Sequence, residues 1–321
     1  MNTRISHHFI LLSFFVFCFS AATSLYGQSL GGKAGAALRF GFGAHSLGMG
    51  NAVAAVVHEN VIAYENPALV PYQPNRSIIA SAGFLSLDRS LNSLSYTQSL
   101  KPAAGLALGV VNAGVSEIQG RDRDGEPTSV YSTSENVFFL SFGLKVAREL
   151  SVGVTAKILY HSLYDGIAST TAGFDIGALY AFDENLLVAA ILQDINSKYQ
   201  WETSTLYGRN GNITVDRFPL RRKIAVSYNW AEPRVTTAAE AEWIGNTFIA
   251  RFGTNVSLTE SFQIIGGLDH VSFAREFDSR PSVGFSFQPG LKSFNPTLYY
   301  TYVVEPYGPS AIHFVAISVE I

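Results

Sequence analysis

Short segments in which apolar and polar residues alternate fill the chain from position 76 to position 321. In the segment 151–160, for example, Val154 and Ile158 fall on one face of an extended chain, while Lys157 falls on the other. A period of two residues is typical of a β-strand whose two faces meet different surroundings. The pattern therefore predicts an all-β fold over this range.

Fourteen segments of this kind can be placed along the chain, and their connections run long, short, long, short. The two longest connections, 116–133 and 194–220, are both odd-numbered. In an outer-membrane barrel every second connection is a tight periplasmic turn, whereas the others face outward and are longer. We therefore expect a fourteen-stranded antiparallel transmembrane β-barrel whose last strand pairs with its first. The predicted strands are 76–85, 91–99, 103–115, 134–147, 150–163, 169–182, 186–193, 221–230, 234–243, 246–256, 262–271, 281–288, 296–304 and 311–321.

Composition favours a membrane environment for this sheet. Apolar residues make up 47% of the chain and charged residues only 15%, against about 25% charged residues in an average soluble domain. Beyond the first thirty residues no apolar run is long enough for a spanning helix. We expect lipid to contact Val154, Phe252 and Ile317. The candidate lumen charges are Lys157, Asp175, Lys223, Glu240, Glu242 and Arg251. A soluble secreted sandwich or propeller is the alternative, although its polar face would usually carry many more charges.

The first 27 residues have the pattern of a secretory signal peptide. A polar start containing Arg4 precedes an apolar core at 9–19, and small residues lead to a predicted cleavage after Gly27. The single cysteine, Cys18, lies inside this leader. The mature protein would therefore have no disulfide, no cysteine ligand and no cysteine nucleophile.

Residues 28–75 differ from the strand-rich part and are too short to fold alone. Glycines allow close approach of backbone to backbone, and Pro67 fixes φ and ends any preceding helix. We expect a Gly-rich and partly helical plug that packs in or on the barrel. The predicted domain division is signal peptide 1–27, plug segment 28–75 and barrel 76–321. The plug motif consists of Gly48, Met49, Gly50, Asn66, Pro67 and Ala68.

The stretch RFGFGAHSLGMGNAVAAVVHENVIAYENPAL resembles the N-terminal signature of the PorV/PorQ family, within the FadL-like outer-membrane proteins, over about forty residues. This resemblance implies a Gram-negative outer-membrane barrel that is a non-enzymatic component or accessory of type IX protein secretion and of cell-surface retention of cargo. Its partners would be outer-membrane lipid, secretion-system components and secreted cargo proteins.

The FadL side of the same resemblance implies a different function, namely an uptake channel for hydrophobic small molecules such as long-chain fatty acids. Such a channel needs an apolar pocket near the plug and an opening in the wall. Glycines at 105, 109 and 114 are candidate kink points for that opening. An apolar lumen near residues 40–70 would favour uptake, and a polar, sealed lumen would favour the secretion role.

Recognition of a partner is expected in the long outward connection 194–220, because loops on a rigid scaffold commonly carry binding residues. The candidate residues of this extracellular recognition loop are Tyr199, Trp201, Tyr207, Arg209 and Asn210.

Sequence patterns for catalysis, cofactors and metals are weak. Glu240 and Glu242 share a strand face, but neither a partnering histidine nor a nucleophile accompanies them, which favours a structural role. Seven scattered histidines suggest no zinc site. The net charge of −3 makes nucleic acid an unsuitable partner. We therefore expect no catalytic residue, no metal, no cofactor and no enzyme activity.

Overall fold

The computed structural model describes residues 32–57, 63–73, 75–164, 166–232, 234–271, 279–290, 295–306 and 308–321. The predicted signal peptide and its cysteine lie outside the described residues. Most residues of the predicted connections 272–280 and 289–295 do so as well.

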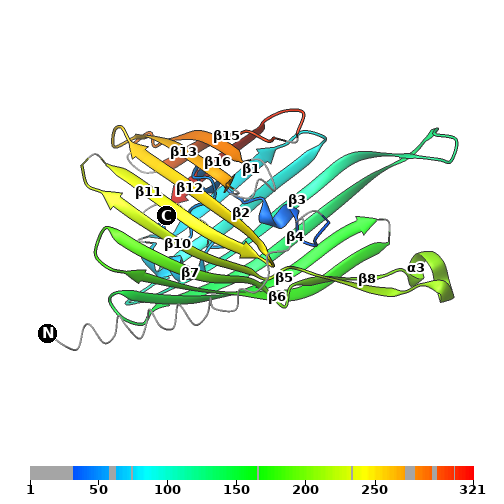
Figure 1. Cartoon of the computed structure of the whole chain (residues 1–321), viewed down its shortest axis with the longest axis horizontal. Helices are drawn as coiled ribbons and strands as arrows, with labels where there is room; N and C mark the ends of the chain where they lie inside the picture. The colour runs from blue at the N-terminus through cyan, green and yellow to red at the C-terminus, as the bar shows by residue number, and fades with distance from the viewer. Residues whose placement is uncertain are drawn as a thin grey trace.

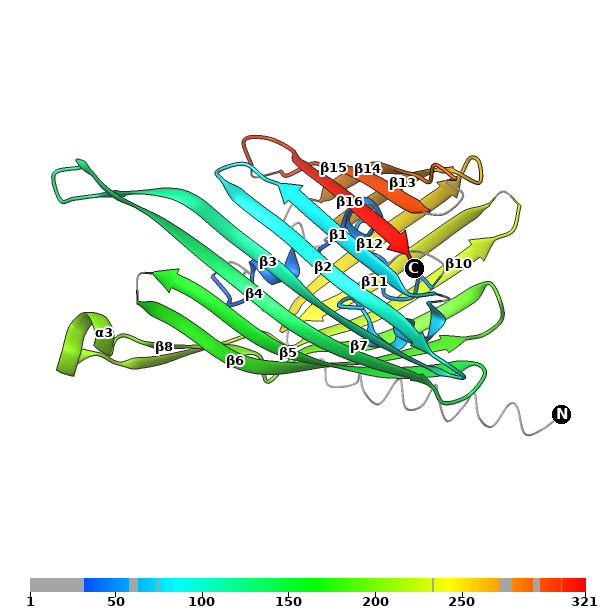
Figure 2. The same cartoon turned by 180° about the vertical axis from the view of Figure 1, so that it is seen from behind.

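Fourteen antiparallel strands form a closed barrel, as predicted, and strand β16 pairs with β1 to close it (Figures 1 and 2). Closure satisfies the backbone hydrogen bonds of both terminal strands, which hydrocarbon requires. The barrel strands are β1 (Ser77–Phe84), β2 (Arg89–Leu100), β3 (Ala104–Arg121), β4 (Pro127–Lys145), β5 (Leu150–Tyr164), β6 (Ile167–Ala181), β7 (Leu186–Ile195), β10 (Arg221–Trp230), β11 (Val235–Ile244), β12 (Thr247–Ser257), β13 (Phe262–Val271), β14 (Arg280–Phe287), β15 (Pro296–Val303) and β16 (Ile312–Glu320).

The two longest predicted connections are not loops, and this part of the prediction is wrong. Strands β3 and β4 continue through 116–133 as a hairpin, and 194–220 contains strands β8 (Lys198–Glu202) and β9 (Ile213–Arg217), which form a separate two-stranded ribbon. Helices α3 (Ser204–Tyr207) and η3 (Gly208–Asn210) connect the two ribbon strands. The outer parts of β3 and β4, and all of β9, bury no regular face, so their sequences lack the alternation that marks a half-buried strand.

Both hairpins project from the same end of the barrel (Figures 1 and 2). Because longer connections of such barrels are extracellular, we call this the outer end and the opposite one the periplasmic end. The predicted alternation of long and short connections does not hold throughout. At the outer end only Gly245 and Asn246 join β11 to β12, where the positive φ of Gly245 (60°) permits a tight turn.

Apolar side chains cover the outside of the barrel. Val154, Phe252 and Ile317 are 53%, 47% and 39% exposed, whereas the neighbouring Lys157 and Asp175 are buried inside. This is the reverse of a soluble sheet, and it matches a barrel wall surrounded by hydrocarbon. Among the described residues, no helix combines the length and the apolar character needed to cross a bilayer.

The described part of the N-terminal segment lies inside the barrel (Figures 1 and 2, blue). Its helices are η1 (Ala37–Arg39), α2 (Ala44–Gly48) and η2 (Pro67–Tyr72). Phe42, Met49 and Ala68 are at most 1% exposed. We call residues 32–73 the plug. It runs from the outer end, where η1 contacts β3, to the periplasmic end, where η2 packs on β3–β6.

A row of four glycines on adjacent strands receives helix η2. The row consists of Gly105, Gly143, Gly153 and Gly177, which stand opposite one another in register on β3, β4, β5 and β6. A Cβ atom at Gly153 would lie 2.5 Å from the carbonyl carbon of Pro67, and one at Gly177 would lie 2.1 Å from Oδ1 of Asn66. Any side chain in this row would therefore push the plug off the wall.

A second pair of glycines receives the Gly-Met-Gly part of the plug. Gly253 and Gly267 face each other on β12 and β13. A Cβ atom at Gly253 would lie 2.4 Å from the carbonyl oxygen of Met49, and one at Gly267 would lie 2.0 Å from the backbone nitrogen of Gly50. Gly50 itself has φ of 59°, a conformation that side chains rarely adopt. The plug thus touches the wall backbone to backbone on two sides.

The glycines proposed as kink points do not open the wall. Strand β3 pairs with β2 and with β4 without a break from Ala104 to Val115. Gly105 belongs to the glycine row, and a Cβ atom at Gly109 would lie 2.5 Å from the carbonyl oxygen of Leu94. Close packing, rather than bending, explains these two glycines.

We predict that Gly267→Ala destabilises the barrel, whereas Gly266→Ala, its neighbour on the same strand, does not. The new methyl group at 267 collides with plug backbone, while at 266 it meets only Cγ2 of Thr254 at 3.7 Å. Overpacking should lower the free energy of unfolding by about 1–3 kcal/mol, against about 0.5 kcal/mol or less for the control. Urea unfolding in lipid vesicles, followed by tryptophan fluorescence, measures both. Equal effects would contradict the proposed plug contact.

Candidate functional site

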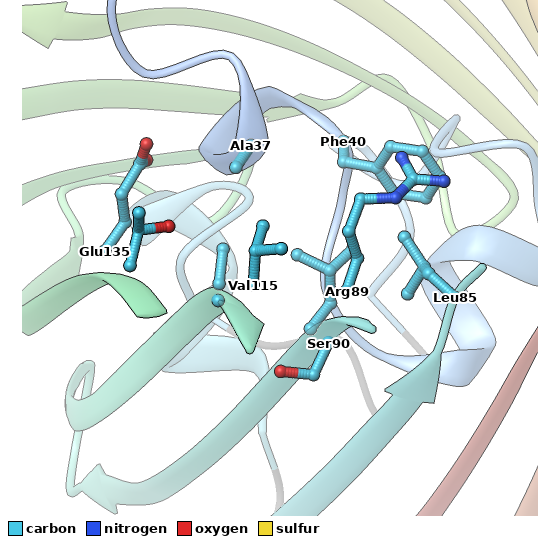
Figure 3. A pocket seen from close by; sticks show the side chains of 11 residues that line it. Ala37, Phe40, Leu85, Arg89, Ser90, Val115 and Glu135 are labelled. Atoms are coloured by element: carbon cyan, nitrogen blue, oxygen red, sulfur yellow. The ribbon is translucent and has the colours of Figure 1, made fainter. Parts of the chain in front are cut away.

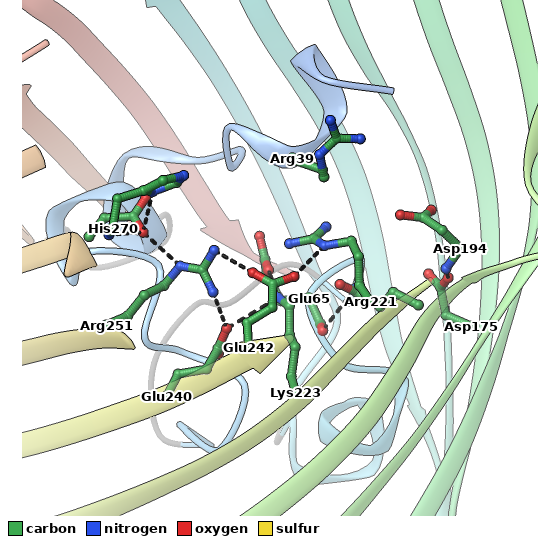
Figure 4. Close-up of polar contacts among 12 residues, drawn as sticks. Arg39, Glu65, Asp175, Asp194, Arg221, Lys223, Glu240, Glu242, Arg251 and His270 are labelled. Carbon is green, nitrogen blue, oxygen red and sulfur yellow. Dashed lines mark hydrogen bonds and ion pairs between the residues drawn. The ribbon is translucent and has the colours of Figure 1, made fainter. Parts of the chain in front are cut away.

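Arg251 on β12 stands at the centre of a group of buried charges in the lumen (Figure 4). Its Nη1 lies 2.9 Å from Oε1 of Glu240, and its Nε lies 2.7 Å from Oδ1 of Asp269. Its Nη2 contacts Glu242. One guanidinium therefore binds three carboxylates, using the planar fork of donors that distinguishes arginine from lysine.

Further cations complete the pairing of these carboxylates. Arg221 contacts Glu242, and Arg280 Nη2 lies 2.9 Å from Oδ2 of Asp269. Lys223 Nζ lies 3.4 Å from Oε1 of Glu240 and 3.6 Å from Oε2 of Glu65, which belongs to the plug. Buried charges are tolerated when each has a partner of opposite sign.

A second group forms around Lys157 on β5. Its Nζ lies 2.7 Å from Oδ1 of Asp175 and also contacts Asp194. The register between β6 and β7 shifts beside Asp194, which has φ of 65°. This irregularity lets Asp194 point inward, next to Gln193, which also points inward and bonds the plug carbonyl of Tyr64.

The charges of these two groups, counted together with Arg39 of the plug, balance. We call the two groups together with Arg39 of the plug the polar network. Its cations are Arg39, Lys157, Arg221, Lys223, Arg251 and Arg280, and its carboxylates are Glu65, Asp175, Asp194, Glu240, Glu242 and Asp269. Six of each sign leave no net charge. All six candidate lumen charges lie in it, and the candidate acid–base pair Glu240 and Glu242 is held by cations. The described residues contain no group of His, Cys, Asp and Glu suited to a metal ion.

Sequence reasoning missed half of the network. Arg221 shares a strand face with Lys223, a signal that was available in the alternation of β10. Asp269 and Arg280 stand opposite each other on β13 and β14, a pairing that only the register reveals. The alternation does not reveal Asp194, because the bulge beside it interrupts the period of two.

The polar network also fixes the plug. Asn51 Nδ2 donates to Oδ2 of Asp269 and to the carbonyl of Phe40, both at 3.0 Å. Asn66 precedes Pro67 as the N-cap of η2, and its Oδ1 accepts a bond of 2.9 Å from the nitrogen of Ala68. These residues explain the Asn-Pro-Ala motif, because an asparagine cap followed by proline begins a helix well. The plug and the network fill the middle of the lumen.

An apolar pocket lies at the outer end, between the start of the plug and strands β1–β4 (Figure 3). Its volume is about 130 Å³, and Ala37, Phe40, Leu85, Ala113 and Val115 are among the residues that line it. Arg89 stands at its edge and forms an ion pair of 2.8 Å with Glu305. We call it the outer pocket.

A second pocket shares Phe40 with the outer pocket and has a different chemistry. Its volume is about 250 Å³, and its lining includes three arginines, Arg39, Arg251 and Arg280, together with His270. The guanidinium of Arg280 lies 4.5 Å from the centre of the Phe40 ring. No carboxylate among the described residues lines this cavity, which we call the cationic pocket.

The candidate recognition residues fall into two places. Tyr199 and Trp201 on β8 are buried, with ring centres 5.4 Å apart. Tyr207, Arg209 and Asn210 lie at the exposed tip of the ribbon, in α3 and η3. The structure therefore does not bring all five together.

Comparison with known proteins identifies the fold. No family model and no curated protein matches the sequence. Among solved structures, the toluene transporter TbuX of Ralstonia pickettii is 13% identical, with a TM-score of 0.59 over 88% of this chain and 98% of that one. The toluene transporter TodX of Pseudomonas putida is 12% identical, with a TM-score of 0.57 over 87% and 96%. The monoaromatic hydrocarbon channel CymD is 12% identical, with a TM-score of 0.61 over 87% and 96%.

At this level of identity the likeness establishes the fold alone. Together with the apolar exterior and the closed ring of strands, it shows that the chain has the barrel fold of these transporters and channels.

We predict that Arg251→Met lowers the free energy of unfolding by about 3–5 kcal/mol, because three buried carboxylates lose a shared partner. Arg222→Met on β10, whose side chain is only partly buried and points away from the lumen, is the control and should change it by about 0.5 kcal/mol or less. The two urea midpoints in lipid vesicles test this. If both variants unfold at the same urea concentration, the network does not stabilise the barrel.

Proposed function

We propose that the protein is a non-enzymatic outer-membrane channel for the uptake of small apolar or amphipathic molecules. The observation that carries this proposal is the pair of adjoining pockets at the outer end, one apolar and one cationic, with Phe40 between them. The likeness of the fold to structures titled as toluene and monoaromatic hydrocarbon transporters supports it.

The size of the outer pocket limits what enters it. Its volume of about 130 Å³ is close to the ~150 Å³ of an engineered apolar cavity that binds benzene. One ring, or a few carbons of a chain, fits this space. The cationic pocket next to it suits a carboxylate, because guanidinium groups bind carboxylates through charge-assisted hydrogen bonds. The substrate class is therefore a hydrocarbon or a fatty acid with its head against Arg280.

Passage beyond the pockets requires the plug to move. The polar contacts that hold it on the β10–β13 side include the bond from Asn51 to Asp269, the ion pair between Glu65 and Lys223 at 3.6 Å, and the bond from Ser227 Oγ to the carbonyl of Ala55. These contacts use wall side chains and can break without deforming the wall, whereas Gly253 and Gly267 hold the Gly-Met-Gly part by close packing. The glycine row on the opposite side holds η2 by shape.

A second candidate is the role of the PorV/PorQ family as an accessory of type IX secretion and of cargo retention. The filled, charge-balanced lumen favours it, because a protein that only presents an outer surface needs no path through the barrel. The plug motif and the projecting hairpins agree with this role. Its partners would be secretion components and cargo proteins, which no comparison supports.

Uptake is tested with Ala113→Phe, which fills the outer pocket, and with Val110→Phe, which adds the same ring to the outward face of the same strand. In proteoliposomes we expect toluene entry to fall about tenfold or more for the first variant, equivalent to ~1.4 kcal/mol, and to stay unchanged for the second. Heat-modified electrophoretic mobility checks that both barrels are folded. Undiminished toluene entry through a folded Ala113→Phe barrel would refute the pocket.

Arg280→Met separates the two substrate classes. It should reduce octanoate entry while leaving toluene entry unchanged, because only octanoate carries a carboxylate. A pull-down from solubilised outer membranes tests the second candidate: co-purified secretion components or cargo, with no hydrocarbon or fatty-acid entry in proteoliposomes, would replace uptake by secretion.

A further inference from the structure

A third and larger pocket lies at the outer mouth, between the first described residues of the plug and the β8–β9 ribbon. Its volume is about 470 Å³, within the ~300–1,000 Å³ typical of small-molecule sites. Residues 32–36 form one wall, and the ribbon and strands β4 and β5 form the other. It is separate from the outer pocket except for Glu135, which lines both. We call it the mouth pocket.

Aromatic rings form one part of its lining. His161 lies 4.7 Å from Tyr199 and 5.1 Å from Trp201, measured between ring centres, and Phe218 packs behind Tyr199 at 4.9 Å. These rings fix one another edge to face, which makes the cluster rigid. It therefore presents a preformed surface to a ligand.

Carboxylates are held beside these rings by hydrogen bonds. Tyr199 donates from its hydroxyl to Oε2 of Glu135 at 3.1 Å, and Trp201 donates from Nε1 to Oδ2 of Asp216 at 2.7 Å. Burial, and then the neighbouring Glu135, raise the pKa of Tyr199, so its hydroxyl remains a donor. Each carboxylate keeps capacity to accept further bonds, because an ionised carboxylate has about four acceptor positions.

Cations balance these carboxylates in the lining. Lys33 and Arg217 face the pocket together with Glu135 and Asp216, so the four charges sum to zero. A charged ligand therefore finds as much repulsion as attraction. Donors and acceptors are both present, next to apolar rings.

A buried polar atom at this site lacks a partner. His161 is only 7% exposed, and its Nδ1 makes no hydrogen bond within the described part of the chain. The nearest carboxylate oxygen, Oε1 of Glu135, lies 3.7 Å away, too far for a hydrogen bond. An unsatisfied buried nitrogen is unfavourable by about 1–3 kcal/mol, and a ligand hydroxyl between His161 and Glu135 would satisfy both.

We propose that the mouth pocket binds a single sugar ring, either of a free saccharide or at the end of a surface glycan. A pyranose has apolar C–H faces that pack on aromatic rings, and hydroxyls that both donate to carboxylates and accept from Lys33, Arg217 or His161. It is neutral, like the lining, and its size suits the cavity. A hydrocarbon would offer no hydrogen bond to these four charged groups, and an ammonium ion would lie beside two cations.

This site is independent of the proposed uptake of apolar molecules. It lies at the outer end, where saccharides from the surroundings and the polysaccharide of neighbouring lipids are both within reach. The pocket and its ligand chemistry stand whether the barrel is a channel or a secretion accessory.

The test uses the full-length mature protein in detergent micelles and titrates glucose, galactose, mannose and N-acetylglucosamine by calorimetry. We expect saturable binding of at least one. Glu135→Gln and Asp216→Asn should each weaken it about tenfold to a hundredfold, the effect of losing a hydrogen bond to a charged group. Asp122→Asn, at the exposed tip of the β3–β4 hairpin, is the control and should bind like the native protein.

Two further measurements distinguish the sources and keep the proposal open to refutation. If smooth lipopolysaccharide displaces the bound sugar and rough lipopolysaccharide does not, the ligand is a surface glycan. If neither displaces it, the ligand is a free saccharide. The proposal is overturned if none of the four sugars binds at concentrations from 50-fold that of the protein up to about 50 mM. Binding that survives unchanged in both carboxylate variants, or saturable binding of choline in place of sugar, overturns it too.

Discussion

A closed ring of backbone hydrogen bonds is the constraint on which the rest of this structure depends. Hydrocarbon offers no partner to a free N–H or C=O group, so a spanning sheet must leave no open edge. The register between β1 and β16, from Ser77 opposite Glu320 to Phe84 opposite His313, supplies the last seam of that ring. Once the ring is closed, apolar side chains must face outward, and every charge in the spanning region must face the lumen.

The polar network is a consequence of that division. Charges inside a low-dielectric wall would repel one another or remain unsolvated unless they pair. Removal of one partner leaves the other as an uncompensated buried charge, which is strongly destabilising. Arg251 contacts three carboxylates, two on β11 and one on β13, and Lys223 reaches from the wall to Glu65 of the plug. The ion pairs that neutralise the charged side chains of the wall therefore also position the plug. The plug in turn lines the pockets at the outer end.

Much of this architecture is predictable from the sequence, because lipid-facing and lumen-facing residues alternate along each barrel strand. All fourteen barrel strands were predicted, and Lys157, Asp175 and Arg251 were placed in the lumen, since alternation is a local property. The ribbon of β8 and β9 was missed because it has no lipid face. The cationic pocket was also missed, because Arg39, Arg251 and Arg280 meet only through the fold. Local patterns reveal strand faces, whereas the pairing of distant residues depends on register and bulges.

The glycine row has a consequence for how the chain assembles. Helix η2 rests on β3, β4, β5 and β6, which lie in the first half of the barrel sequence. The wall partners of Glu65 and Asn51, which are Lys223 on β10 and Asp269 on β13, come much later in the chain. Loops between near neighbours close with less loss of chain entropy than those between distant ones. The N-terminal half of the sheet can thus cradle the segment first, and the remaining strands then wrap around an occupied interior. Threading through a finished ring is avoided, because the ring is completed last by the C-terminal strand.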